Sequence, residues 1–208
     1  PLSQQLAEYV RACFAGLWIR SYEQDDALQE IARLCHRESW QLAAWDIDQG
    51  LRFPGAAETP SATANDPLAV LKALPSLATP DGTVLLVLHN FHRFLNSAEI
   101  VQTLAHQVQQ GKQHRTFLVI LSPVVQLPPE LEKLFVVLEH ELPGREQLLD
   151  IARGIATESG ELPDGPELER VLDAAAGLTR YEAEGAFSLA IVQHRKIEPG
   201  PIWQLKSQ

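Results

Sequence analysis

Polar residues that could carry chemistry stand directly after apolar, strand-like segments. Those segments are residues 17–21, 83–88 and 116–121. The polar residues at or just after their ends are Ser21 to Asp26, His89, Asn90 and Ser122. In a parallel sheet the carboxyl ends of the strands meet at one edge, and α/β proteins bind their ligands there. Any chemistry of this chain is therefore expected at that edge.

The segment that follows the first strand argues against ordinary phosphate binding. A nucleoside triphosphate is normally held by GxxxxGK[ST], in which backbone N–H groups and one lysine surround the phosphates. Residues 21–28 (SYEQDDAL) contain no glycine and no lysine, and they carry three carboxylates. The Gly111-Lys112 pair is followed by Gln113 and is interpreted as a helix C-cap. We therefore expect neither ATP binding nor hydrolysis by the usual route.

Two further positions are degenerate in the same sense. A nucleotide-hydrolysing sheet would end its third strand in Asp-Glu, for Mg²⁺ and for the attacking water, but His89 and Asn90 stand there. Ser122 ends the fourth strand, where a polar residue can sense a γ-phosphate. Its plainer interpretation, which we favour, is a hydroxyl that satisfies backbone groups in a Ser-Pro turn.

Other kinds of catalytic site find little support. His89 and His92 are three residues apart, but no cysteine or obvious carboxylate beside them completes a tetrahedral set, so no metal is expected. There is no GxSxG elbow for a serine nucleophile. Cys13 and Cys35 lie on the apolar faces of expected helices and are interpreted as buried, unpaired thiols. No residue is assigned a catalytic role.

The order of elements predicts an α/β protein with a five-stranded parallel sheet and helices on both faces. Alternating strands and helices give this class through right-handed crossovers. We expect an α/β core over residues 1–142, a small helical lid over 143–197, and a linker over 198–208. Residues 54–66 (PGAAETPSATAND) are expected to form a mobile loop, and residues 128–134 a short proline-led helix.

Charge and composition exclude several partners. The 208 residues include 27 acidic and 17 basic side chains, so the net charge is about −10. Nucleic acid is an unfavourable partner, because its binding depends on clustered cations. Apolar runs are too short to span a bilayer. The first residue is Pro1 and the chain contains no methionine, so we expect a piece of a longer protein. Its two scattered cysteines indicate a reducing compartment.

Aromatic residues indicate one candidate contact surface. Phe91 and Phe94 are expected to pack the following helix against the sheet. Trp203 lies in the expected linker, where Pro199, Gly200 and Pro201 disfavour a helix, so it has no local element to pack within. Trp203 is therefore the best candidate for contact with another domain.

Several phrases together resemble one family. Residues 116–139 (TFLVILSPVVQLPPELEKLFVVLE), the following LPGRE and the later GLTRYEAE are similar to the strand-four and lid regions of AAA+ ATPases. Nearly the whole chain resembles a degenerate, N-terminal AAA-like domain of a plastid- and cyanobacterium-type AAA+ ATPase, in which an active domain follows. The SPVVQLPPELEK phrase is the most specific element of this resemblance.

The resemblance implies roles for particular positions. Ser122 would correspond to sensor 1 and Arg180 to sensor 2, while His89 and Asn90 would take the Walker B position. Residues 48–66 would form the loop that lines the pore of assembled rings. It further implies a homo-oligomer that contacts a downstream ATPase domain of the same chain. ATP and Mg²⁺ would be used by that longer protein, in a bacterial cytoplasm or a plastid stroma, with neither nucleic acid nor membrane as a partner.

Two functions remain open at this point. The chain is either a non-catalytic interaction and assembly module, or a weak, unconventional nucleotide-binding ATPase domain. A free-standing signalling fold is disfavoured, because three lid-like helices follow the sheet.

Overall fold

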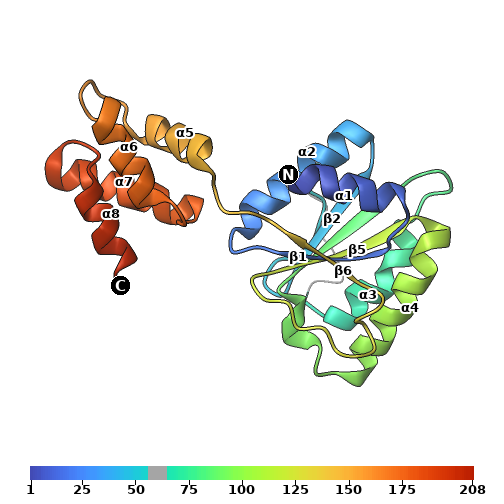
Figure 1. Ribbon diagram of the computed structural model, residues 1–208. Helices are drawn as coiled ribbons and strands as arrows, with labels where there is room; N and C mark the ends of the chain where they lie inside the picture. The colour runs from blue at the N-terminus through green and yellow to red at the C-terminus, as the bar shows by residue number, and fades with distance from the viewer. Residues whose placement is uncertain (56–64) are drawn as a thin grey trace. The chain divides into compact units, whose positions relative to one another are not determined.

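A computed structural model describes residues 1–55 and 65–208, and the chain forms two compact units, Pro1–His140 and Glu141–Gln208 (Figure 1). Residues 56–64, which make up most of the loop expected at 54–66, lie outside the described residues. No helix among the described residues has the length and apolar character needed to cross a membrane. Each unit is described by itself below.

The first unit alternates strands and helices. Its strands are β1 (Gly16–Arg20), β2 (Gln41–Asp46), β3 (Gly50–Arg52), β4 (Val84–His89), β5 (Thr116–Ser122) and β6 (Val136–Glu139). Its helices are α1 (Leu2–Arg11), α2 (Gln24–Glu38), α3 (Pro67–Leu77) and α4 (Ala98–His114), together with the 3-10 helix η1 (Phe91–Phe94).

The strands form one sheet in the order β3-β2-β4-β5-β1-β6. All neighbours pair in parallel except β2 and β3, which are antiparallel. The α/β class and the five parallel strands are confirmed, and one further strand, β3, was not predicted. Strands β1 and β5 send their connections in opposite directions, toward β2 and β6 respectively. Their carboxyl ends therefore flank the switch point at which such sheets bind ligands.

Residues 48–66 were expected to form a loop, but the segment begins with a turn and the short strand β3, which was not predicted. The Asp46 Oδ1 atom accepts hydrogen bonds from the Asp48 N–H (2.9 Å) and the Gln49 N–H (2.7 Å), which closes a tight turn. Gly50 follows with φ +71°, a left-handed conformation that glycine adopts easily. The chain thus reverses and pairs Gly50 with Asp46. The sequence pattern did not predict this hairpin because its second strand has only three residues, too few to show an alternation.

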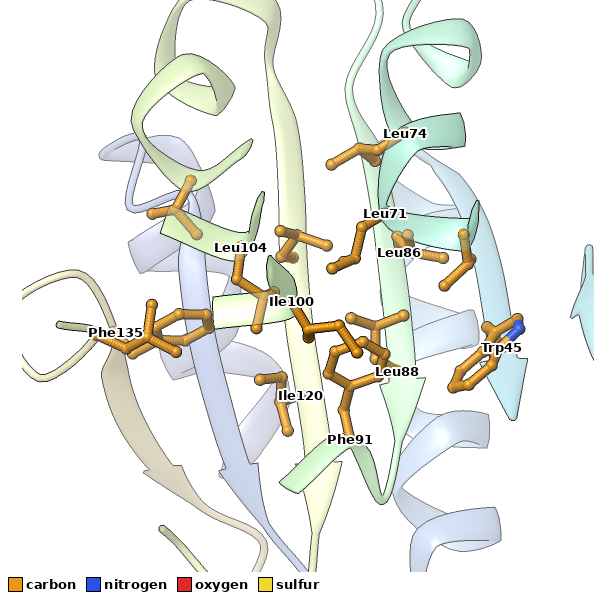
Figure 2. Packing of buried hydrophobic residues seen from close by; sticks show 14 of the residues in the cluster. Trp45, Leu71, Leu74, Leu86, Leu88, Phe91, Ile100, Leu104, Ile120 and Phe135 are labelled. Carbon is orange, nitrogen blue, oxygen red and sulfur yellow. The ribbon is translucent and has the colours of Figure 1, made fainter. Parts of the chain in front are cut away.

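Helices cover both faces of the sheet, as expected. Helices α1 and α2 lie on one face, and α3 and α4 lie on the other (Figure 1). On the second face, side chains of α3 and α4 such as Leu71 and Leu104 pack against Leu86, Leu88 and Ile120 of the central strands (Figure 2). Continuous apolar strands of this kind are typical of a sheet that is buried on both faces.

The aromatic residues after β4 belong to this core. Phe91 and Phe94 pack edge-to-face with each other and with Trp45, with ring centroids 5.4–5.7 Å apart. Phe91 is fully buried beside Trp45 (Figure 2). The expectation that Phe91 and Phe94 fasten the following segment to the sheet is confirmed.

Two local predictions in the first unit are wrong. Gly111 is not a helix C-cap: it lies inside α4, where an added Cβ would meet the Thr116 carbonyl oxygen at 2.3 Å, so this glycine permits close helix–strand packing. Residues 129–134 form turns instead of a helix. There Leu131 donates to the Pro128 carbonyl oxygen and Leu134 to that of Leu131, which is a turn pattern, and burial of Leu131 fixes it to the core.

The second unit is a bundle of four helices: α5 (Arg145–Ile155), α6 (Gly165–Ala175), α7 (Arg180–His194) and α8 (Pro199–Lys206). Helix α7 begins with a capping box, in which Thr179 Oγ1 accepts from the Glu182 N–H and Glu182 accepts from the Thr179 N–H. The three expected lid helices are present.

Helix α8 contradicts the linker expected at 198–208. Prolines are compatible with the first turn of a helix, because the N–H groups there have no intrahelical acceptor. Pro201 and Ile202 are buried, and Ile202 belongs to the apolar cluster of this unit. Lys206 Nζ donates to the carbonyl oxygens of Ala174 (3.0 Å) and Ala176 (2.9 Å) at the end of α6. Tertiary packing thus overrides the weak helix propensity of this segment.

Candidate functional site

The junction between β1 and α2 begins the candidate site. Ser21 is buried, and its N–H donates to the Ser122 carbonyl oxygen at 2.9 Å, which extends the sheet by one residue. Its Oγ atom accepts from the Glu23 N–H at 2.9 Å and lies 2.6 Å from His140 Nδ1. Ser21 stands where a phosphate-binding loop would begin, and it is therefore bonded to His140, the last residue of the first unit.

His140 lies beside Ser21 at the same edge of the sheet. It follows β6 and donates its own N–H to the Arg20 carbonyl oxygen, so the backbone of β1 and β6 fixes it. Its side chain is only 7% exposed, and its Nε2 atom lies 3.4 Å from Asp26 Oδ2 and 3.7 Å from Glu30 Oε2 on α2. One imidazole therefore connects β1, β6 and α2. We call the group of Ser21, Asp26, Glu30 and His140 the His140 cluster.

A second set of hydrogen bonds joins α2 to the end of β4. Gln24 Nε2 donates to Asn90 Oδ1 at 2.6 Å, and Gln24 Oε1 lies 3.0 Å from His89 Nδ1. Asn90 has φ +53°, which asparagine tolerates better than most residues, and this conformation turns the chain toward η1. Gln24 thus connects to both His89 and Asn90, the residues for which the resemblance implies the Walker B position.

The protonation state of His89 follows from its surroundings. Burial lowers the pKa of His89, and the Arg52 charge lowers it further, whereas Asp46 and Asp25 act in the opposite direction. The imidazole is therefore neutral near pH 7. Because Gln24 Oε1 is an acceptor, Nδ1 carries the proton and Nε2 is an acceptor.

Ser122 already uses its hydroxyl within the core. The side chain is fully buried; its Oγ donates to the Val124 carbonyl oxygen at 2.6 Å and accepts from Trp18 Nε1 at 2.9 Å. The plainer interpretation of Ser122, a hydroxyl that satisfies a Ser-Pro turn, agrees with these contacts. They leave the hydroxyl committed to its own turn.

The start of α2 carries carboxylates instead of the cations that a phosphate would need. Asp25 and Asp26 occupy the first turn of α2, where the helix dipole favours negative charge. Arg20, the cation at the end of β1, is paired with Glu139 at 2.7 Å, and a hydrogen bond from this pairing raises the pKa of Arg20. The helix terminus that would hold a phosphate therefore already faces carboxylates from its own side chains.

Reactive groups for covalent or metal chemistry are not assembled here. Burial raises the pKa of the Cys35 thiol to about 12, which makes it a poor nucleophile. Within residues 1–55 and 65–208, no three His, Cys, Asp or Glu side chains lie together in a way that could hold a metal ion.

The two remaining candidates lie in the second unit. Arg180 is the first residue of α7, and its guanidinium lies 3.8 Å from the carboxylate of Glu184. Trp203 lies on α8, where its side chain is 53% exposed and Lys206 Nζ lies 4.6 Å from the ring centroid. The prediction that Trp203 lies outside any helix or strand was wrong, but its exposure leaves it as a candidate contact residue.

Sequence reasoning missed His140, and it included Gln24 only as one of the polar residues after the first strand. A usable signal existed for His140, because it lies two residues after the last strand predicted, 135–138, and is therefore expected at the same edge as Ser21 and His89. No such signal existed for Gln24, since an isolated glutamine at a helix start is common.

Comparisons with known proteins identify the family of this folded chain. The model of the N-terminal domain of SpoVK-like AAA ATPases matches residues 2–140, and that of their second domain matches residues 146–208. The chain belongs to the SpoVK-like AAA ATPase family. The resemblance of its sequence to a degenerate AAA+ region is thereby confirmed at the level of the family.

Relatives and solved structures agree with this assignment. The uncharacterized AAA domain-containing protein ycf46 of Trieres chinensis is 22% identical over 207 residues, which are 99% of this chain and 41% of that protein. The chain thus spans about two fifths of that relative's length. Among solved structures, it is similar to RuvB from Thermotoga maritima (TM-score 0.58, 14% identity, 99% of this chain and 67% of that one). It is also similar to C. elegans PCH-2 (TM-score 0.53, 10% identity, 98% and 66%). These two likenesses concern the fold.

Proposed function

We propose that this SpoVK-like chain is a non-catalytic interaction and assembly module of a larger AAA+ ATPase. The observation that carries the proposal is the set of hydrogen bonds that the chain's own side chains make with one another at the carboxyl edge of the sheet. The His140 cluster connects β1, β6 and α2, and Gln24 bonds His89 and Asn90, to which the resemblance assigns the Walker B position.

Nucleotide binding would require two changes at once. Phosphates need free N–H groups and at least one cation, yet the start of α2 carries Asp25 and Asp26 and no lysine. The existing hydrogen bonds of Ser21 and Gln24 would also have to break, and each buried group left without a partner costs about 1–3 kcal/mol. Both terms oppose a triphosphate.

A fold that keeps its surfaces without nucleotide chemistry can still bind proteins. We propose that the partners are the downstream ATPase domain of the same polypeptide and neighbouring copies, in a homo-oligomer. ATP and Mg²⁺ would then be bound elsewhere in the longer protein, in a bacterial cytoplasm or plastid stroma.

Isothermal titration of the 208-residue chain with Mg-ATP tests the first part of this proposal. No saturable heat is expected up to millimolar nucleotide, because the start of α2 offers carboxylates where phosphates would lie. The longer protein is the matched positive control. One-to-one binding of Mg-ATP to the chain at micromolar concentration would contradict the proposal.

Deletion of residues 1–208 from the longer protein tests the second part. Assembly or client binding should fall, while the remaining ATPase domain should still bind nucleotide. If assembly and client binding are both unchanged, the chain is not an assembly module.

A further inference from the structure

Helix α7 carries apolar residues on two opposite faces. Its inner face is buried in the second unit through Ala183, Ala186, Phe187 and Ala190. On the outer face Tyr181 is 84% exposed and Val192 is 80% exposed, and residues 185–193 (GAFSLAIVQ) contain no charged side chain. A solvent-facing helix keeps charged residues on its outer face, whereas a helix that is apolar on all sides is typical of a buried one. The outer face of α7 is therefore expected to be covered by a partner.

The exposed residues of this outer face follow a heptad spacing. Tyr181, Gly185, Ser188 and Val192 are four, three and four residues apart, and all of them are exposed. This is the spacing of the residues along which two helices pack side by side. We call these four residues the α7 seam.

Gly185 is not required by the fold of the chain itself. It lies inside α7, although glycine is among the residues that favour a helix least. A Cβ added at this position would meet no atom within 4 Å, and the backbone there does not have a positive φ. A glycine of this kind allows the backbone of a partner to approach closely.

The α7 seam is self-complementary for an antiparallel pair of helices. A two-fold axis through the middle of the seam places Tyr181 of one copy opposite Val192 of the other, and Gly185 opposite Ser188. The small residues then lie where the two helices come closest, and the large apolar residues pack on either side of them. The same residues therefore fit a second copy of this chain.

The charges at the two ends of α7 favour the same antiparallel order. Glu182 and Glu184 lie near its start, whereas His194, Arg195 and Lys196 follow one another at its end. Arg195 is exposed and forms no ion pair among the described residues. In an antiparallel pair the basic end of each helix meets the acidic end of the other, and the two helix dipoles oppose each other. A parallel pair would instead bring like charges together.

We propose that two copies of this chain pair through the α7 seam as an antiparallel, two-fold symmetric dimer. This inference deepens the proposed function, because it rests on copies of the chain meeting one another and names the surface at which they meet. A stable interface buries about 800 Å² on each partner, and one helix face supplies less than that. The 208-residue chain should therefore dimerise weakly, with a Kd of about 0.1 mM.

Sedimentation equilibrium of the 208-residue chain up to about 0.5 mM measures this dimer. Val192→Glu places a charge against Tyr181 of the other copy and should weaken the dimer by at least about tenfold. Gly185→Leu blocks the closest approach of the helices and should weaken it as much, although the chain's own fold leaves room for a side chain there. Val137→Glu is the matched control, because it makes the same change at an exposed valine of β6 in the first unit and should alter the Kd by less than about twofold. A chain that stays monomeric at every concentration would overturn the proposal, and so would equal weakening by Val137→Glu and Val192→Glu.

Cross-linking with a short bismaleimide tests the antiparallel order. The background is Cys13→Ser, since Cys35 is buried. A mixture of Tyr181→Cys and Val192→Cys chains should cross-link at least about fivefold faster than either variant alone, because two copies of position 181 lie about 16 Å apart along the helix axis. Equally fast cross-linking of the unmixed variants would contradict the antiparallel dimer. None of these outcomes bears on the Mg-ATP titration or on the deletion of residues 1–208, so the proposed function is judged separately.

Discussion

The two units of this chain differ in the polar residues that they bury and in the apolar residues that they expose. In the first unit, Ser21 and His89 are buried at the ends of β1 and β4, where Ser21 bonds His140 after β6 and His89 bonds Gln24 of α2. Exposed large apolar residues occur in both units, but the two most exposed lie in the second: Tyr181 is 84% exposed and Val192 80%, against 72% for Tyr22 in the first unit. The first unit thus pairs polar side chains at its sheet edge, whereas the second unit carries the two most exposed large apolar side chains of the described residues.

Buried polar residues and exposed apolar residues are under different physical constraints. Buried polar residues at the sheet edge need hydrogen-bond partners, since unpaired buried polar groups destabilise the fold. Exposed apolar side chains face no such requirement, and a group of them on a protein surface marks a place of contact. Substitutions in the two units should therefore differ in kind as well as in size.

The largest effect on stability is expected from Ile202→Ala on α8. Ile202 is fully buried among the helices of the second unit, so its truncation should cost about 2–5 kcal/mol. Hydrogen exchange of the amides in α5 to α8 should accelerate by at least about 30-fold, while that of β4 and β5 should not change. Unchanged exchange in α5 to α7 would mean that α8 does not belong to this unit.

A smaller effect is expected from His140→Ala in the first unit. The substitution leaves Ser21, Asp26 and Glu30 without the imidazole that connects them, which should cost about 1–3 kcal/mol. Urea unfolding followed by tryptophan fluorescence measures this, because Trp18 and Trp45 are fully buried in that unit.

His194→Ala is the matched control for the His140 cluster. His194 is about half exposed and lies 3.8 Å from Glu198, so its removal should cost less than about 0.5 kcal/mol. If the two substitutions lower the free energy of unfolding equally, the contacts of the His140 cluster do not stabilise the first unit.

A third and weaker effect should appear in acid. The pKa of His89 is lower in the folded chain than its ordinary value of about 6.5, so below about pH 6.5 the unfolded chain binds a proton first. The contribution of neutral His89 is therefore fully present above that pH and is lost as the pH falls toward the folded pKa. The wild-type urea midpoint should fall more steeply between pH 7.5 and 5 than that of His89→Gln. Parallel pH profiles would contradict the buried, neutral state of His89.

Much of the fold could be predicted because its signals are local or periodic. The continuous apolar runs of β4 and β5 indicate central strands, and the capping box at Thr179 marks the start of α7. Strand β3 and helix α8 could not be found in this way. The three residues of β3 show no measurable alternation, and α8 depends on burial of Ile202, which is decided by distant residues.

The sequence predicted where the candidate site lies, but not which hydrogen bonds its residues form. The edge at which Ser21, His89 and Asn90 lie follows from the parallel sheet, and the missing glycine and lysine were visible in the sequence. The hydrogen bonds at this edge join residues far apart in the chain, such as Ser21 and His140. Side-chain pairing over such separations depends on strand order, which a single sequence does not give.

The smallest effect on the fold is expected from Trp203→Ala. The ring is about half exposed and contacts Lys206 Nζ, so its loss should cost less than about 1 kcal/mol in the 208-residue chain. If Trp203 contacts another domain or copy, the same substitution in the longer protein removes a buried aromatic anchor, which is worth about 2 kcal/mol or more. Analytical ultracentrifugation of the longer protein should then show assembly weakened by at least about 30-fold. Tyr181→Ala is the comparison variant, since it removes a more exposed ring at the start of α7 in the same unit. Wild-type assembly of Trp203→Ala would remove Trp203 from the contact surface, and a loss with Tyr181→Ala alone would place that surface on α7.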